Sequence, residues 1–115
     1  MIAVIFELIC HNEKESQYLD IAAELKPLLQ TIDGFISIER FRSISNEKKL
    51  LSLSFWRDEQ AVMQWRNVMQ HRLAQQAGRN SIISDYRLRV VSVLRDYGLN
   101  EREAAPDDSK VFHAI

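Results

Sequence analysis

The sequence predicts an α+β fold of the ferredoxin-like type, with the element order β-α-β-β-α-β, a four-stranded antiparallel sheet and both helices on one face. Three observations predict it. Apolar runs rich in β-branched and aromatic residues alternate with two amphipathic stretches in that order. The length of 115 residues suits one domain. A hydrophobic fraction of 46% with only three Gly and two Pro is typical of a globular protein. We expect the domain to span residues 1–98 and a C-terminal tail to span residues 99–115.

The first strand and helix are predicted at the N-terminus. Residues 2–10 are apolar and rich in β-branched types, as in a buried strand. Asn12, with Glu15 three residues later, predicts an N-cap with its capping-box partner. A helix is then expected over about 13–32, and Pro27 should kink it or end its regular part. Its buried side is predicted to comprise Tyr18, Ile21, Ala22, Leu25, Leu28, Leu29 and Ile32.

A hairpin and a second helix follow. Two apolar-rich runs, 35–44 and 50–56, flank a short polar loop, which predicts two antiparallel strands. Asp58 is a good N-cap for a helix that runs to about Gln76, with Gly78 as its stop. The buried side of this helix is predicted to comprise Ala61, Val62, Trp65, Val68, Met69 and Leu73.

The last strand, predicted over residues 86–97, carries apolar residues on both sides. Tyr86, Leu88, Val90 and Leu94 point one way, and Val91, Val93 and Tyr97 point the other. Two helices can cover only one face of the sheet, whereas a monomer of this topology would prefer a polar second face. We therefore expect a homodimer that packs sheet on sheet.

Arginines concentrate on two of the predicted strands. They are Arg40, Arg42, Arg87, Arg89 and Arg95, and Glu7 and Glu39 could lie among them. Arginine on a buried sheet is costly unless it is paired, so we expect interface ion pairs. The alternative is that one arginine faces a pocket and stabilises a substrate oxyanion.

The tail has two parts. Residues 99–110 have the composition of an exposed linker. Residues 111–115 are apolar again, which indicates either a frayed end or an edge strand added to the partner subunit.

Composition argues against several classes of protein. A formal net charge of −1 gives no broad attraction to nucleic acid or to an anionic membrane. The single Cys10 cannot form an intrachain disulfide, and His11 and His113 do not form a metal cluster, so we expect no metal and a cytoplasmic location. The apolar N-terminus lacks a basic start and contains Glu7, so it reads poorly as a signal peptide or a membrane span.

Three segments, 34–41, 54–61 and 65–71, carry a family resemblance. In them a Trp ends the third strand, and an acidic-capped helix carries a second Trp about nine residues later. Over roughly residues 1–97 the chain resembles the antibiotic biosynthesis monooxygenase (ABM) domain family. The resemblance implies a dimeric α/β barrel with a pocket between helices and sheet in each subunit. Members of this family differ in activity: some oxygenate aromatic polyketides without a cofactor, some are quinol oxygenases, some degrade haem, and many have no assigned activity.

The candidate site centres on the second helix. Trp65 is either a core aromatic or a pocket residue that stacks on a flat substrate. His71 is either a surface residue or an acid/base at the pocket rim, and Asn67 would add a polar contact there. Further substrate-binding candidates are Trp56, Tyr86 and Arg40.

Haem degradation is not the expected reaction. In that branch of the family a histidine follows the helical Trp by ten residues and an asparagine lies in the first strand; here those positions hold Gln75 and Glu7, and His71 comes one turn too early. We expect a monooxygenase without cofactor that acts on a small aromatic or quinol-like compound. The alternative is a non-catalytic small-molecule-binding or stress-associated dimer.

Overall fold

The structure is a computed structural model that describes the backbone of residues 1–75 and 79–114 and the side chains of residues 1–70 and 81–110. Its elements confirm the predicted β-α-β-β-α-β order, with one short helix before the last strand and one near the C-terminus. They are β1 (Ile2–Cys10), α1 (Glu15–Leu29), β2 (Phe35–Arg42), β3 (Lys49–Trp56), α2 (Glu59–Gln75), α3 (Arg79–Ile82), β4 (Ile83–Ser92) and α4 (Asp107–Ala114).

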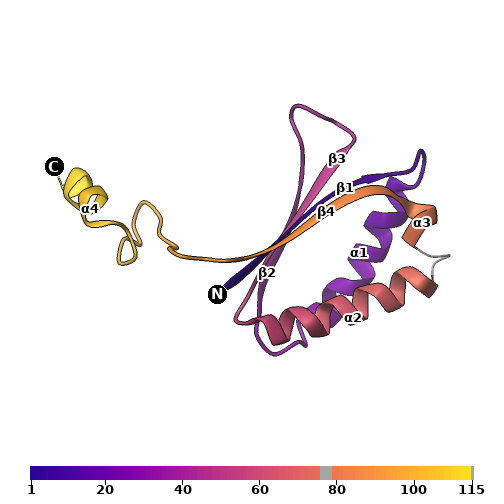
Figure 1. Ribbon diagram of the computed structural model, residues 1–115, viewed down its shortest axis with the longest axis horizontal. Helices are drawn as coiled ribbons and strands as arrows, with labels where there is room; N and C mark the ends of the chain where they lie inside the picture. The colour runs from indigo at the N-terminus through magenta and orange to yellow at the C-terminus, as the bar shows by residue number, and fades with distance from the viewer. Residues whose placement is uncertain (76–78, 115) are drawn as a thin grey trace.

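The four strands form one antiparallel sheet in the order β2-β3-β1-β4. The N-terminal strand is therefore central, and β2 and β4 are the edges. Both long helices, α1 and α2, lie on one side of the sheet, and its other side carries no helix (Figure 1). This arrangement confirms the predicted ferredoxin-like fold.

The face of the sheet toward the helices, here the helix face, holds the core. Val4, Phe6 and Leu8 alternate along β1 and are buried on this face. The strand register places them in rows with residues of β3 and β4, for example Phe6 between Ser52 and Leu88. The helices complete the core with buried residues at helical spacing. These are Tyr18, Ile21, Leu25 and Leu29 of α1, and Ala61, Val62, Trp65 and Met69 of α2.

The opposite face, here the open face, mixes half-buried apolar residues with charges. One row across it contains Glu39, Leu53, Ile5 and Arg89, and the next contains Phe41, Leu51, Glu7 and Arg87. Glu7 contacts Arg89 at 3.6 Å and Lys49 at 3.9 Å. Glu7 thus forms ion pairs within its own chain, whereas the expectation was ion pairs across a dimer interface.

The start of α1 differs from the prediction. Lys14, not Asn12, occupies the N-cap position, and no side chain caps the helix. Glu15 instead binds the guanidinium of Arg42 on β2, and this hydrogen bond lowers the pKa of the carboxyl group. The capping-box prediction was wrong because a long-range charged partner was available to Glu15. At the other end Pro27 lies inside the helix, which ends at Leu29.

The last strand begins and ends earlier than predicted. It spans Ile83–Ser92 rather than residues 86–97, and α3 precedes it directly. Gly78, the predicted stop of the second helix, lies outside the described residues. After a last ladder contact, from the Val93 amide to the Met1 carbonyl at 3.0 Å, the chain leaves the sheet.

The C-terminal segment, residues 93–114, extends away from the sheet and helices and ends in α4 (Figure 1). It folds on itself around Arg102, whose guanidinium lies 5.1 Å from the Tyr97 ring centroid and donates hydrogen bonds to the Gly98 carbonyl and to Ser109. Leu94 and Leu99 remain 88% and 77% exposed. The sequence had indicated a frayed end or an edge strand over residues 111–115, and the structure has the helix α4 over Asp107–Ala114.

Candidate functional site

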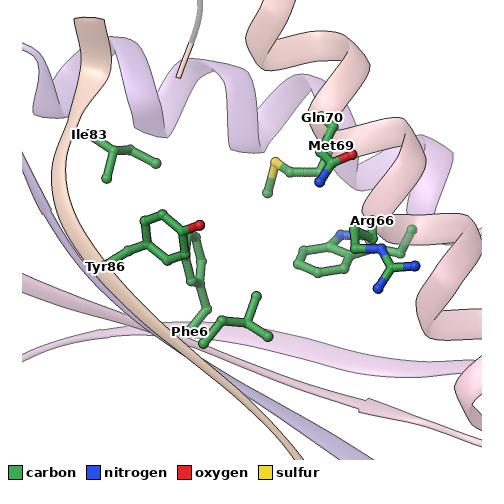
Figure 2. A pocket seen from close by; sticks show the side chains of 8 residues that line it. Phe6, Arg66, Met69, Gln70, Ile83 and Tyr86 are labelled. Atoms are coloured by element: carbon green, nitrogen blue, oxygen red, sulfur yellow. The ribbon is translucent and has the colours of Figure 1, made fainter. Parts of the chain in front are cut away.

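A pocket of about 240 Å³ lies between α2 and the helix face of β1 and β4 (Figure 2). Its lining is mostly apolar. The residues that line it are Phe6, Trp65, Arg66, Met69, Gln70, Ile83, Tyr86 and Leu88. A concave apolar site with a few polar groups at its edge is the usual form of a small-molecule binding site.

The helix α2 supplies one wall through its periodicity. Trp65 and Met69 are four residues apart, so they lie on the same side of the helix, and both are buried. The residues that follow each of them, Arg66 and Gln70, are exposed. Each turn of α2 thus places one apolar residue in the pocket and one polar residue at its rim.

The sheet supplies the other wall. Phe6 of β1 and Leu88 of β4 share a row, and Tyr86 lies one row along. The rings of Phe6 and Tyr86 meet edge to face with centroids 5.6 Å apart, and both point toward α2 (Figure 2). Tyr86 is 45% exposed, so its ring lies between the pocket and solvent. This pair gives the pocket an aromatic floor.

Trp65 serves the core and the pocket together. It is only 4% exposed, and its ring packs against that of Trp56 with centroids 5.8 Å apart. The indole N–H of Trp56 donates a 2.8 Å hydrogen bond to Ser54 Oγ, whereas that of Trp65 is buried without an acceptor among the described residues. Trp65 is therefore a core residue that also borders the pocket, and Trp56 lies in the core behind it.

The structure brings two of the predicted site residues, Trp65 and Tyr86, to the pocket. It does not bring Trp56, Asn67 or Arg40 there. Asn67 is exposed on α2. The side chain of His71 lies outside the described part of the chain.

Arg40 lies beside a different buried residue. It is on the helix face of the edge strand β2, in the row of Ser52, and its charge opposes the rise that burial causes in the pKa of Tyr18. The Tyr18 hydroxyl and Arg40 Nε are both buried without a hydrogen-bond partner among the described residues. Because β3 and β1 separate β2 from β4, Arg40 lies at the opposite edge of the sheet from the β4 residues of the pocket wall.

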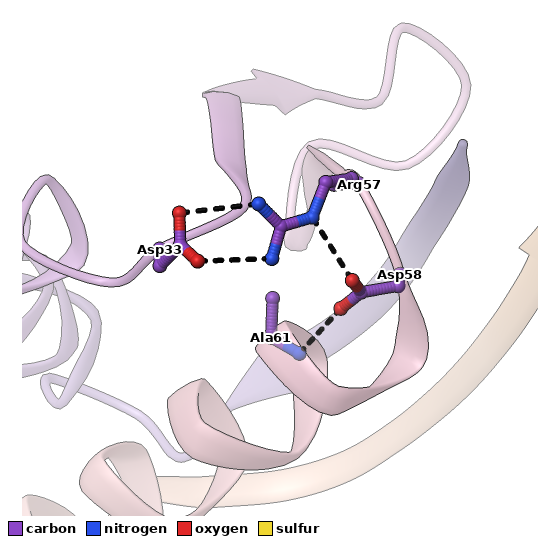
Figure 3. A network of polar contacts seen from close by, with 4 residues as sticks. All are labelled: Asp33, Arg57, Asp58 and Ala61. Carbon is purple, nitrogen blue, oxygen red and sulfur yellow. Dashed lines mark hydrogen bonds and ion pairs between the residues drawn. The ribbon is translucent and has the colours of Figure 1, made fainter.

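A polar network fixes the N-terminus of α2 (Figure 3). Arg57 donates two hydrogen bonds to Asp33, at 3.0 and 3.1 Å, and one to Asp58 at 3.0 Å. Asp58 accepts a hydrogen bond from the Ala61 amide at 3.0 Å, which confirms it as the predicted N-cap. The Ala61 amide and Arg57 lower the pKa of Asp58, and Arg57 lowers that of Asp33.

Sequence reasoning missed most of the pocket lining. It placed Phe6 in a buried strand and Met69 on a buried helix side without assigning either to a site, and Arg66, Gln70 and Ile83 received no role. One signal was available, because Trp65 and Met69 lie one turn apart with polar neighbours at 66 and 70. This spacing within one helix does not predict that β4 lies opposite Trp65 and Met69, because that position depends on the tertiary structure.

Two further kinds of feature are absent from the described part of the chain. No three His, Cys, Asp or Glu side chains within the described ranges gather closely enough to bind a metal ion. None of the described helices combines the length and hydrophobicity that a membrane span needs.

Comparison with known proteins gave concordant matches. The sequence profile described as antibiotic biosynthesis monooxygenase matches residues 1–77. The chain is 45% identical over 101 residues to a protein of Pyricularia oryzae named jasmonate monooxygenase ABM; the match covers 88% of this chain and 47% of that protein. The chain thus spans about half the length of this relative.

Two solved structures share the fold. That of Rv0793 from Mycobacterium tuberculosis matches with a TM-score of 0.70 and 17% identity, covering 84% of this chain and 98% of that one. That of SnoaB, a cofactor-independent oxygenase from Streptomyces nogalater, matches with a TM-score of 0.66 and 9% identity, covering 83% of this chain and 94% of that one.

Proposed function

Because the chain belongs to the antibiotic biosynthesis monooxygenase family, we propose that it is a monooxygenase that oxidises a small aromatic or quinol-like compound in the pocket beneath α2. One observation carries the proposal. The pocket is apolar, has a volume of about 240 Å³, and is lined by the rings of Trp65, Phe6 and Tyr86. Flat faces of this kind suit a planar substrate and keep water away from it.

Names given to related proteins support the oxygenase reaction. The relative from Pyricularia oryzae is named a monooxygenase, and SnoaB, which has the same fold, is a cofactor-independent oxygenase. The reaction itself, its substrate and the absence of a cofactor are proposals for this chain.

The proposed chemistry uses the substrate as its own reductant. An electron-rich substrate loses a proton, and its anion reduces O₂. When a ring CH₂ becomes C=O, one oxygen atom enters the substrate and the other leaves as water. The four electrons that O₂ accepts all come from the two C–H bonds that are replaced. No external reductant is needed, so the protein has to bind the ring, exclude water and move protons.

The residues have distinct proposed roles. Trp65 and the Phe6–Tyr86 pair hold the substrate ring. His71, which follows the pocket residue Gln70 directly in the sequence, is proposed to exchange the proton, since an ordinary histidine titrates near neutral pH.

We also propose that the active form is a homodimer that packs through the open face. Half-buried apolar residues, Ile5, Leu51, Leu53 and Phe55, cross the middle of this face, and Phe41 is 41% exposed at its edge. A two-fold axis parallel to the strands would place β2 of one copy over β4 of the other, because these are opposite edges. Glu39 would then face the partner row that contains Arg89.

Oxygen uptake tests the reaction directly. The purified protein, with no added cofactor, is given a panel of quinols and polycyclic phenols while dissolved O₂ is measured. We expect uptake with at least one compound, and Trp65→Phe should reduce it. Gln64→Ala, an exposed neighbour on α2 that does not line the pocket, is the matched control and should leave the rate unchanged.

Two other results would contradict the proposal. Binding of planar compounds without oxygen uptake would indicate a non-catalytic ligand-binding protein. Uptake that is unaffected by Trp65→Phe and by other changes in the lining would place the reaction elsewhere in the molecule.

A further inference from the structure

We propose that the ligand of the pocket is amphipathic and anionic, and that Arg66 binds its carboxylate or equivalent anion at the pocket mouth. This inference rests on the proposed function, because it names the chemical class of compound that the same pocket would accept. It comes from the positive charge of Arg66 at the pocket, which the proposed oxygenation does not use.

Arg66 is the sole charged residue among the described residues that line the pocket. It is exposed, and within the described ranges it forms neither a hydrogen bond nor an ion pair. Arg42, Arg57 and Arg89 differ from it, since each contacts a carboxylate of the same chain. The donors of Arg66 are thus available to a ligand.

The position of Arg66 follows from the helix that carries it. Trp65 points into the pocket, so the next residue, Arg66, lies at the edge of the same wall. Gln70 lies one turn further along that edge, and its amide can also donate hydrogen bonds. Figure 2 shows both side chains on α2, across the pocket from Tyr86 and Ile83.

The chemistry of the lining decides where an anion can lie. Deep in the pocket a carboxylate would lose its hydration among Phe6, Met69, Ile83 and Leu88 and find no cation, which is strongly unfavourable. At the mouth it keeps water on one side and accepts paired hydrogen bonds from the planar guanidinium. An apolar body inside and an anionic group at Arg66 satisfy both requirements.

The whole molecule does not attract anions by itself, because its formal net charge is −1. A preference for an anionic ligand would therefore be local to this site. It should also weaken as salt is added, because an exposed pair is screened.

A pair of probes with the same body tests the inference. The probes are 1-naphthylacetate and its neutral amide, 1-naphthylacetamide, and binding to the full chain is measured by ligand-detected NMR titration at pH 7. We expect the acid to bind roughly five-fold more tightly than the amide, as for a partly exposed charged contact. Arg66→Gln should abolish this preference and leave the affinity for the amide unchanged.

Two variants serve as controls. Arg95→Gln makes the same change in net charge at an exposed position that does not line the pocket, so the preference for the acid should remain. Arg66→Lys keeps the charge but loses the planar pair of donors, so it should keep part of the preference.

The outcomes separate this inference from the proposed function. Equal binding of acid and amide to the unmodified protein, or loss of the preference in Arg95→Gln, would overturn the role of Arg66 while leaving an aromatic-binding pocket. Failure of both probes to bind would overturn the pocket as an aromatic site, and the role of Arg66 with it.

Discussion

Trp65 packs in the core and also lines the pocket, so replacing it should affect both stability and ligand binding. Trp65→Phe should lower the free energy of unfolding by roughly 1–2 kcal/mol, because a smaller ring leaves space beside Trp56, and full truncation to Ala should cost about 3–5 kcal/mol. It should also weaken binding of planar ligands, because stacking area is lost. Denaturant unfolding and ligand titration measure the two effects.

Trp56 is the matched control for that experiment. It is fully buried, does not line the pocket, and donates a hydrogen bond to Ser54, so Trp56→Phe should destabilise the fold at least as much. At temperatures where the Trp56→Phe variant stays folded, it should still bind planar ligands. If both variants lose binding in proportion to stability, the pocket role of Trp65 is wrong.

His71 makes a prediction about turnover rather than stability. If His71 is a pocket acid/base, His71→Ala should reduce the rate of oxygen uptake by roughly 10²-fold or more. If His71 is a surface residue, the same substitution should change the free energy of unfolding by no more than about 0.5 kcal/mol and leave the rate unchanged. The rate of the variant, with Gln64→Ala as reference, distinguishes the two.

Single residues were the least predictable level of the site. The hydrophobic period placed Trp65 on the buried side of a helix, and that prediction is confirmed. The period carries no information on which buried residues border an empty volume. Arg40 was a candidate because arginines concentrate on two predicted strands, and the structure places it on the edge strand β2, outside the pocket lining.

At the scale of elements, the junction of β3 and α2 depends on Gly34. Its φ is +95°, and a Cβ there would lie 3.0 Å from Ala61 Cβ and 3.4 Å from Arg57. Gly34→Ala should therefore cost about 1–2 kcal/mol from backbone strain alone. Gly98→Ala is the control, since a Cβ there meets nothing within 4 Å. Equal melting temperatures for the two variants would contradict this account.

The network at the start of α2 predicts a dependence on acid pH. The folded state lowers the pKa of Asp33 and of Asp58 below their ordinary value of 3.8, so their contribution to stability is present above that pH. It is lost as the pH falls through the lower, folded-state values. We expect Arg57→Met to melt earlier than the unmodified protein at pH 7, and the gap to narrow at pH 2–3. Thermal unfolding across this range measures it.

That acid effect should be modest, because the three side chains are largely exposed. A gap that is unchanged at low pH would show that Arg57 stabilises the junction by packing rather than by charge.

Elements were predictable where a regular pattern extends over several turns or strand repeats. The two long helices and the hairpin strands follow such patterns. The four-residue α3 is too short to show a period, and its absence from the prediction shifted the expected start of β4. The α1 capping box had the right spacing, but Arg42, distant in sequence, competed for Glu15.

For the whole molecule, the proposed dimer makes a prediction about charge. Glu39→Arg should weaken a homodimer formed through the open face, because it would place two cations together opposite Arg89 of the partner subunit. Adding Arg89→Glu should restore part of the dimer. Analytical ultracentrifugation at micromolar concentration measures it, and a monomeric unmodified protein would contradict the dimer.

The fold as a whole was the most predictable level, because the order of elements and the count of strands restrict the topology to few choices. The order of elements does not determine the oligomeric state in the same way. Alternating apolar residues on both faces of the strands indicate that something covers the open face, and a second copy remains the prediction.

The strand order has a further consequence for how the protein folds during synthesis. The central strand β1 is made first, yet its partner β4 is made last, about eighty residues later in the chain, as the pairing of Ile2 with Ser92 and of Cys10 with Ile83 shows. Contacts this distant in sequence form slowly, because a long loop must close before they are gained. A nascent chain that stops after α2 would leave one edge of β1 unpaired and prone to pair with other chains. The second wall of the pocket, and with it any ligand binding, would arise only when the last strand is in place.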